Sequence, residues 1–372
     1  MGVHGPNGRI TYFTGAFPSA CGKTSTSMIS GQTIVGDDIA YFRQKDGVIR
    51  CVNVEKGIFG IIRDVNPDDD AVIYKAITNP GEIIFGNVLI NDNKPYWLGM
   101  GQDLPAEGVN YCGNWKTGDK GPDGKATTAS HKNARYTIAI SDLTNRDEMA
   151  DAPEGVEVGG VIYGGRDSDT CVPVEQAFDW NEGIIAKGAS LESETTAATL
   201  GAEGVRTFNL MSNLDFLSLP LGKYIQNNLD FGNTAKAAPA IFSVNYFLKG
   251  ADGNYLNGMN DKMVWILWAE LCVNGDVEKI KTPTGYIPKY ADLAKLFKEK
   301  LNKDYSEAEY VEQFSIRIPQ LLAKIDRIEK VYKEQVPDTP KLVYEVFDKH
   351  RAALKDLQTA KGDVVSPFDL EK

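Results

Sequence analysis

The chain has 372 residues, of which 42% are hydrophobic and 24% are charged, and its formal net charge is −11. A chain of this length and apolar content can bury a large core and fits two or three domains. The acidic balance excludes a general nucleic-acid or anionic-membrane binder, and no run approaches the ~18 uninterrupted apolar residues of a membrane span.

The first predicted strand, Ile10 to Phe13, leads into a loop that is typical of phosphate binding. The loop spans Gly15–Thr24 and precedes the helix-permissive run Thr26 to Ile29. In such a loop, N–H groups at the helix start attract phosphate oxygens, a lysine adds charge and a threonine hydroxyl can ligate a cation. Phe17 replaces the first glycine of the usual pattern. We predict phosphate binding by Ser19, Ala20, Cys21, Gly22, Lys23 and Thr24.

A second predicted strand, Gln32 to Val35, ends in a glycine and two aspartates, Asp37 and Asp38. Phosphoryl transfer needs a divalent cation, and an aspartate near the loop threonine is the usual way to hold it. An isolated Asp-Asp pair is more often a turn or a helix cap. The neighbouring phosphate loop favours metal binding here, and we predict Asp38, Asp37 and Thr24 as the ligands.

Short apolar runs separated by Gly, Asp and Asn turns continue to about residue 275, which predicts a mixed-sheet architecture. The predicted strands are 72–74, 82–85, 136–140 and 158–163, with a long polar loop over 103–132. The expected fold class is therefore mixed α/β (α+β), with a phosphate-loop-containing sheet lobe over 1–275 and a helical region over 276–372.

The C-terminal region changes to helix formers and charges. Helical spacing predicts a helix over 291–297, and Ser306 to Glu309 reads as a capping box that opens another helix. Pro319 is expected to kink or restart that helix, and a third is predicted over 340–359. An apolar stripe is predicted to be core or partner surface: Leu321, Leu322, Ile325, Ile328 and Val331.

Several segments resemble the GTP-dependent phosphoenolpyruvate carboxykinases. The segments Phe17–Thr24 and Gly36–Ala40 match that family, whose phosphate loop has a reactive cysteine at the position of Cys21. Further matches follow in the family's order: Val54–Gly60, Ile84–Val88, Tyr96 with Trp97, Asn133–Arg135, Tyr163–Arg166 and Ser193–Ala198. The resemblance implies the family's C-terminal catalytic lobe and a reversible conversion of oxaloacetate to phosphoenolpyruvate and CO2.

The resemblance also implies roles for individual residues. Asp38 matches a ligand of the metal that polarises the enolate, with Mn2+ and Mg2+ as cofactors, and Lys23 and Arg166 would neutralise the transferred phosphoryl group. Asn133 and Arg135 match the substrate motif, where a planar arginine gives a carboxylate two parallel hydrogen bonds. The following residues match the family's mobile lid, for which a plain helix is the alternative: Ser193, Glu194, Thr195 and Thr196.

Cys21 is expected at a helix start beside Lys23, where a thiol pKa falls and reactivity with electrophiles rises. Phosphoryl transfer has no step that uses a thiolate, so we expect a reactive but non-catalytic residue. The other four cysteines lack C-x-x-C spacing and are expected to be buried or surface thiols. Together with an N-terminus that lacks a signal pattern, they predict a cytoplasmic protein.

The match weakens in the region that would recognise a nucleotide base. Phe247 and Tyr255 resemble residues of the family's guanine slot, but a further phenylalanine and a base-reading asparagine are replaced. Met259 could still stack on a purine, and Asp261 could accept from its N–H groups. After Arg166, an aspartate and a serine replace the family's usual Arg-Pro. Pyrophosphate-dependent carboxykinases also resemble the chain, so the donor, GTP (yielding GDP) or pyrophosphate (yielding phosphate), is left open.

In the family, a lysine and a histidine metal ligand and a whole N-terminal domain precede the phosphate loop. This chain has too few residues before the loop to supply them, and His4 is too close to it to be that histidine. We expect a C-terminal lobe whose partner is the N-terminal domain of the same parent protein, and which is inactive alone. Two other classes stay open: a non-catalytic phosphate-loop module, and an unrelated small-molecule kinase, in which Asn133–Arg135 would have no purpose.

Overall fold

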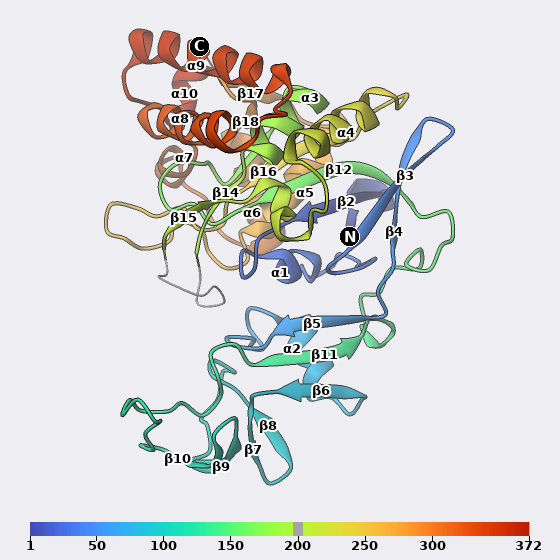
Figure 1. The fold of residues 1–372 in the computed structure, drawn as a ribbon, viewed down its shortest axis with the longest axis vertical. Helices are drawn as coiled ribbons and strands as arrows, with labels where there is room; N and C mark the ends of the chain where they lie inside the picture. The colour runs from blue at the N-terminus through green and yellow to red at the C-terminus, as the bar shows by residue number, and fades with distance from the viewer. Residues whose placement is uncertain (196–203, 372) are drawn as a thin grey trace.

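A computed structural model describes residues 1–195 and 204–371. An upper body contains the largest sheet and most of the helices, and a lower lobe, residues 57–139, contains smaller sheets (Figure 1). The chain enters the lower lobe after β4 and returns to the upper body before β12, so the lobe is an insertion in the larger unit.

Within the described residues, nine strands form the main sheet in the order β1-β2-β12-β16-β13-β18-β17, with β4 paired to β12 and β3 to β4. β2, β12 and β16 are parallel neighbours, so the loops that follow them meet at one edge of the sheet. The strands are Gly2–His4 (β1), Ile10–Ala16 (β2), Ala40–Lys45 (β3), Val48–Asn53 (β4), Val156–Gly164 (β12), Val174–Gln176 (β13), Ala240–Val244 (β16), Lys279–Lys281 (β17) and Tyr286–Pro288 (β18).

Helices cover both faces of this sheet because alternate residues of its central strands point to opposite sides. Ile162 and Phe242 pack in one core with α5, α6 and α7, whereas Val161 and Ile241 pack in another with α4, α8 and α9. The helices are Lys23–Ser27 (α1), Ala71–Thr78 (α2), Trp180–Gly183 (α3), Leu221–Asn233 (α4), Lys262–Val273 (α5), Tyr290–Leu301 (α6), Glu307–Phe314 (α7), Ile318–Gln335 (α8), Lys341–Lys361 (α9) and Pro367–Leu370 (α10), with a π-helix at Ile184–Ala189.

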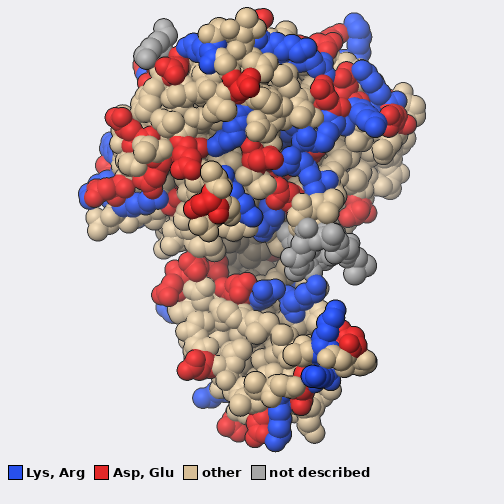
Figure 2. Space-filling view, turned by 90° about the vertical axis from the view of Figure 1, so that its left-hand side faces the viewer, with Lys and Arg blue, Asp and Glu red and all other residues tan. Residues whose placement is uncertain are grey.

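The lower lobe has its own core, built from two antiparallel sheets and α2. The strands are Gly57–Ile61 (β5), Ile83–Gly86 (β6), Leu89–Asn91 (β7), Lys94–Tyr96 (β8), Glu107–Asn110 (β9), Gly113–Lys116 (β10) and Arg135–Ala139 (β11). Met28 and Ile34 of the upper body are buried in this core beside Trp97 and Tyr136. These side chains join the lobes. Figure 2 shows that the molecule narrows between them, with charges of both signs along the narrowing.

Two short two-stranded antiparallel sheets complete the description. Glu192–Glu194 (β14) pairs with Arg206–Phe208 (β15), and Ile316–Arg317 (β19) pairs with Val364–Val365 (β20). No helix in the described part of the chain combines the length and hydropathy that crossing a bilayer requires.

The structure confirms the mixed α/β fold class and most of the C-terminal predictions. Both hydrogen bonds of the capping box at Ser306 are present, and Pro319 lies in the first turn of α8, so it restarts rather than kinks the helix. The apolar stripe of α8 packs into the core through Ile328. The division into regions 1–275 and 276–372 stays a prediction.

Two predicted strands are wrong. Residues 72–74 lie in helix α2, where Ile73 and Ile77, one turn apart, are both buried in the lower core. In the run 32–35, Thr33 and Ile34 form only isolated bridges, because each pairs with a single residue of a different segment. The long segment 103–132 contains the β9–β10 hairpin.

Candidate phosphate-binding site

The loop between β2 and α1 has a strained backbone. Ala20 adopts a positive φ of 59°, which is unusual for a residue with a side chain, and Gly22 has a φ of 107°. A Cβ on Gly22 would also lie 2.9 Å from the Tyr246 ring. Both the conformation and the space therefore require glycine at position 22. Strain of this kind is typical of ligand sites.

Phe17, which replaces the usual first glycine, is a core residue. Its ring is buried and stacks on Tyr246, with centroids 6.3 Å apart. It also covers Gly164 at the end of β12, where any side chain would clash with the ring. Phe17 therefore anchors the loop to the sheet, although it departs from the usual pattern.

Lys23 and the two aspartates lie together as predicted. The Lys23 ammonium forms an ion pair with Asp38 and lies 3.5 Å from Asp37 Oδ2, to which the Thr24 hydroxyl donates at 3.4 Å. Glu55 fixes the turn by accepting from the N–H groups of Asp38 and the next residue, at 2.9 Å each. Burial raises the pKa of Asp37, although the Lys23 charge opposes this.

Asp37, Asp38 and Thr24 fit a divalent cation in their donor chemistry. Asp37 Oδ1 is buried without a hydrogen-bond partner, which a bound ion would supply. In residues 1–195 and 204–371, no group of three or more His, Cys, Asp and Glu side chains is placed to hold a metal. Water and phosphate oxygens would complete the coordination, as is usual for Mg2+.

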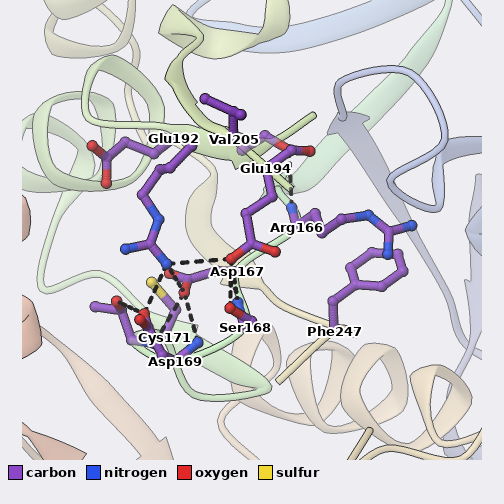
Figure 3. Close-up of polar contacts among 12 residues, drawn as sticks. Arg166, Asp167, Ser168, Asp169, Cys171, Glu192, Glu194, Val205 and Phe247 are labelled. Atoms are coloured by element: carbon purple, nitrogen blue, oxygen red, sulfur yellow. Dashed lines mark hydrogen bonds and ion pairs between the residues drawn. The ribbon is translucent and has the colours of Figure 1, made fainter. Parts of the chain in front are cut away.

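Arg166 contacts both the phosphate loop and the aromatic residues predicted to contact a base. Figure 3 shows its side chain beside Phe247. Its guanidinium lies over the Phe247 ring, 3.7 Å from the centroid. It donates to the Tyr255 hydroxyl at 3.0 Å and to the Ala20 carbonyl at 3.1 Å. The structure therefore brings Arg166, Phe247 and Tyr255 together with the loop.

The aromatic pair does not form a parallel slot in this arrangement. The Phe247 and Tyr255 rings meet edge to face, at 72°, with centroids 6.0 Å apart. Met259 is exposed and could cover a base. Asp261 is buried and accepts from the Gly258 N–H at 2.8 Å, so the expectation that it reads a base edge is wrong for this arrangement.

The expectation of a lowered pKa for Cys21 is also wrong. The thiol is buried, and burial raises its pKa more than the Ser193 hydroxyl and the Arg166 charge lower it. Its Sγ lies 3.2 Å from Ser193 Oγ on β14. Position beside a helix start predicts a thiolate only for an accessible thiol. All five cysteines are free; Cys51 and Cys272 are buried, and Cys112 is exposed.

Asn133 and Arg135 lie in the lower lobe rather than on the loop. Asn133 Oδ1 accepts from Arg135 Nε at 3.0 Å, and the guanidinium lies 5.0 Å from the Phe59 ring centroid. Burial lowers the pKa of Arg135. Within the described ranges, no hydrogen bond or ion pair joins Arg135 to Asp37 or Asp38. Burial raises the pKa of the neighbouring Tyr136, and the negative charges of Asp37 and Asp70 raise it further.

The segment predicted as a lid is extended where it is described. Ser193 and Glu194 belong to β14, which excludes the helical alternative for them, and the Thr195 N–H donates to Val205 at 2.8 Å. Ser193 Oγ accepts from the Arg166 N–H at 3.1 Å. Thr196 lies outside the described residues. The lid function itself stays a prediction.

Sequence reasoning missed two contributors. Glu55 lies in the segment Val54–Gly60, which resembles the family. Its distance from Asp38 along the sequence gives no sign that the two residues are in contact. Tyr246 supports both Phe17 and the helix start, since its hydroxyl lies 3.0 Å from Thr26 Oγ1. A partly open cavity of about 80 Å3 is lined by residues on either side of Arg166, Gly165 and Asp167, and neither Lys23 nor Asp38 lines it.

Comparisons with known proteins point to one family. A family model described as the phosphoenolpyruvate carboxykinase C-terminal P-loop domain matches residues 1–353. Proteins named phosphoenolpyruvate carboxykinase (GTP) from Thermococcus kodakarensis and Pyrococcus horikoshii are 54% and 55% identical over the whole chain. The protein of that name from Saccharolobus solfataricus is 42% identical, also over the whole chain. The chain spans about 60% of the length of these relatives.

A strained loop with Lys23 and Thr24, two aspartates and an arginine at one sheet edge define a phosphate-loop protein. The chain belongs to the GTP-dependent phosphoenolpyruvate carboxykinase family, and it corresponds to the family's C-terminal P-loop domain.

Proposed function

We propose that the protein containing this chain is a GTP-dependent phosphoenolpyruvate carboxykinase, a carboxy-lyase that interconverts oxaloacetate with phosphoenolpyruvate and CO2. The convergence of Lys23, Asp37, Asp38 and Arg166 at the phosphate loop is the observation on which this rests. The names of relatives aligned over the whole chain support it.

Phosphoryl transfer depends on positioning and charge neutralisation rather than on a base. Lys23 and Arg166 would do this work, since both contact the loop or its aspartates. Asp38, Asp37 and Thr24 would hold Mn2+ or Mg2+, which when bound supplies further positive charge to developing oxyanions. Lys23 would exchange its contact with Asp38 for a phosphate oxygen.

Asn133 and Arg135 would bind the substrate carboxylate. The bond from Arg135 to Asn133 uses Nε, so the two Nη nitrogens keep the paired geometry that a carboxylate accepts. The family resemblance gives Arg135 this role.

GTP is the donor that we favour over pyrophosphate. The relatives carry GTP in their names, and the Phe247–Tyr255 pair adjoins Arg166. The N-terminal domain of the same parent protein would be the partner of this chain, in a cytoplasmic enzyme. By itself the chain would bind phosphates but not turn over oxaloacetate.

Thermal unfolding of the chain with Mn2+ and added GTP, GDP, ADP or pyrophosphate tests the proposal. A ligand that binds only the folded state adds about 2.7 kcal/mol of stability at 100 times its Kd. We expect GTP and GDP to shift the melting temperature more than ADP. Equal shifts from pyrophosphate and all nucleotides would contradict a guanine slot, and no shift from any of them would contradict phosphate binding.

Arg166→Met is expected to remove most of the GTP-induced shift, because the variant loses the contacts to Ala20 and Tyr255. Arg146→Met is the matched control, since Arg146 pairs with Asp151 at the surface of another segment. Equal GTP-induced shifts in both variants would show that Arg166 does not bind the nucleotide.

A further inference from the structure

Three carboxylates surround one nitrogen of Arg206 on β15. Figure 3 labels these three residues, Asp167, Asp169 and Glu194. Arg206 Nη2 lies 3.1 Å from Asp167 Oδ1, 2.7 Å from Asp169 Oδ1 and 3.4 Å from Glu194 Oε1. Asp167 and Asp169 belong to the turn that follows Arg166, whereas Glu194 belongs to β14. One cation therefore joins the turn to the β14–β15 hairpin.

The same carboxylates organise the backbone of this turn. Asp167 Oδ1 accepts from the N–H groups of Asp169 and Thr170, at 3.2 and 2.9 Å. Glu194 Oε1 accepts from Ser168, from the N–H at 3.1 Å and from the hydroxyl at 2.5 Å. Protonation or displacement of either carboxylate would therefore disturb the segment that presents Arg166.

Electrostatics make Arg206 necessary to this arrangement. Three negative groups so close together repel one another, most strongly where water is excluded. Asp167 is buried, and burial alone would raise its pKa, but the charges of Lys324 and Arg206 outweigh burial and lower it. The carboxylate is therefore ionised and depends on its cations.

The hairpin in turn touches the site itself. Ser193 Oγ contacts both Cys21 Sγ, at 3.2 Å, and the Arg166 N–H, at 3.1 Å. The Glu194 N–H donates to the Arg166 carbonyl at 2.9 Å. Displacing the hairpin would release the main chain of Arg166 and uncover the phosphate loop at Cys21.

We propose that Arg206 is a positioning residue, which fixes Arg166 and Ser193 against the phosphate loop by neutralising Asp167, Asp169 and Glu194. Its effect on phosphate binding rests on the function proposed above. Its effect on the hairpin does not, and this second effect can be measured without any ligand.

The test is the alkylation of the chain's cysteines by iodoacetamide, followed by mass spectrometry of the peptides. Arg206→Met keeps the aliphatic stem and removes the charge. We expect about tenfold faster labelling of Cys21, because local opening sets the exposed population of a buried thiol. Cys51 and Cys272, buried elsewhere, should keep their rates. A second measurement, pyrophosphate binding by calorimetry, should show about tenfold weaker affinity.

Arg351→Met is the matched control. Arg351 also pairs with three carboxylates, and its side chain is 19% exposed against 21% for Arg206. This control should leave Cys21 protected. Arg206→Lys should restore most of the protection, because a single nitrogen makes all three contacts.

Unchanged labelling of Cys21 in Arg206→Met would overturn the proposal. Equal acceleration at Cys21, Cys51 and Cys272 would also overturn it, since that pattern reports global unfolding. If the unaltered chain binds neither pyrophosphate nor GTP, the phosphate binding proposed above is contradicted, but the labelling still decides the role of Arg206.

Discussion

At the scale of single residues, Asp37 illustrates a buried polar group that the fold tolerates at a cost. One of its carboxylate oxygens is buried without a partner, and burial raises its pKa. An unsatisfied buried polar group typically costs ~1–3 kcal/mol. Such a cost is expected where a ligand supplies the missing contact, as the proposed cation would at Asp37.

Asp37→Asn is expected to stabilise the chain at pH 7 by about 1 kcal/mol, because it removes a poorly solvated charge. The folded-state pKa of Asp37 lies above its unfolded value, so the cost of ionisation is present at neutral pH. It is relieved as the pH falls through the folded-state pKa. The difference between variant and unaltered chain should therefore shrink towards pH 4, as measured by urea unfolding.

The comparison variant is Asp38→Asn, because the Asp38 side chain is 59% exposed. It should change stability by less than about 0.5 kcal/mol. Both variants should lose the Mn2+ dependence of GTP binding. A destabilised Asp37→Asn variant at pH 7 would contradict this account of the site.

At the scale of secondary-structure elements, two glycines determine how closely β12 approaches its neighbours. Gly164 lies under the Phe17 ring, and a Cβ on Gly165 would lie 2.6 Å from the carbonyl oxygen of Glu192. Neither position has a positive φ. Both positions therefore require glycine because a side chain would not fit. The two glycines let the phosphate loop and β14 pack against the start of the Arg166 turn.

Gly165→Ala is expected to destabilise the chain by about 1–3 kcal/mol, the usual cost of overpacking. The new methyl group would push against the β14 backbone, which a flexible side chain cannot relieve. Calorimetric unfolding measures the cost, and hydrogen exchange at the β14 amides should show the displacement.

Gly81→Ala is the control for this change, since its nearest neighbour would be 3.9 Å away and its φ is not positive. We expect it to be neutral or to stabilise by about 0.4–1 kcal/mol, through the unfolded state. Similar costs at both glycines would show that crowding at β14 is not the cause.

At the scale of the whole molecule, side chains of the upper body complete the core of the lower lobe. Ile34 and Met28 belong to the upper body but are buried among residues of the lower lobe such as Ile58 and Trp97. The lower lobe also contains Arg135, whereas the phosphate loop belongs to the upper body. The spacing between the predicted substrate residues and the loop therefore depends on this joint.

Ile34→Ala is expected to cost about 2–5 kcal/mol, because Ile34 is fully buried and a cavity would remain. The loss should loosen the joint, so limited proteolysis should cut the connecting segments 54–56 and 140–155 before the rest of the chain. The exposed Ile90 of β7 is the control, and Ile90→Ala should leave the cleavage pattern unchanged. Cleavage of Ile34→Ala throughout the chain would contradict the proposal that Ile34 acts at the joint between the lobes.

Local sequence patterns predicted the structure correctly wherever the interacting residues are close together in the sequence. The capping box at Ser306, the restart at Pro319 and the phosphate loop itself depend on bonds within a few residues, so periodicity and spacing predicted them. The strand predicted for residues 72–74 was wrong because its structure depends on contacts with distant residues. A three-residue apolar run fits a strand or a helix turn equally, and only packing against the lower core selects the helix.

The sequence by itself determined the family, the mixed α/β class and the residue types that a phosphate, a cation and a carboxylate require. Only the tertiary structure decided the state of Cys21, the location of Asp261 and the pairing of Arg206 with Asp167. These properties depend on burial and on charges brought together from distant segments. Because electrostatic and desolvation energies follow distance in space rather than position in the chain, no local pattern contains them.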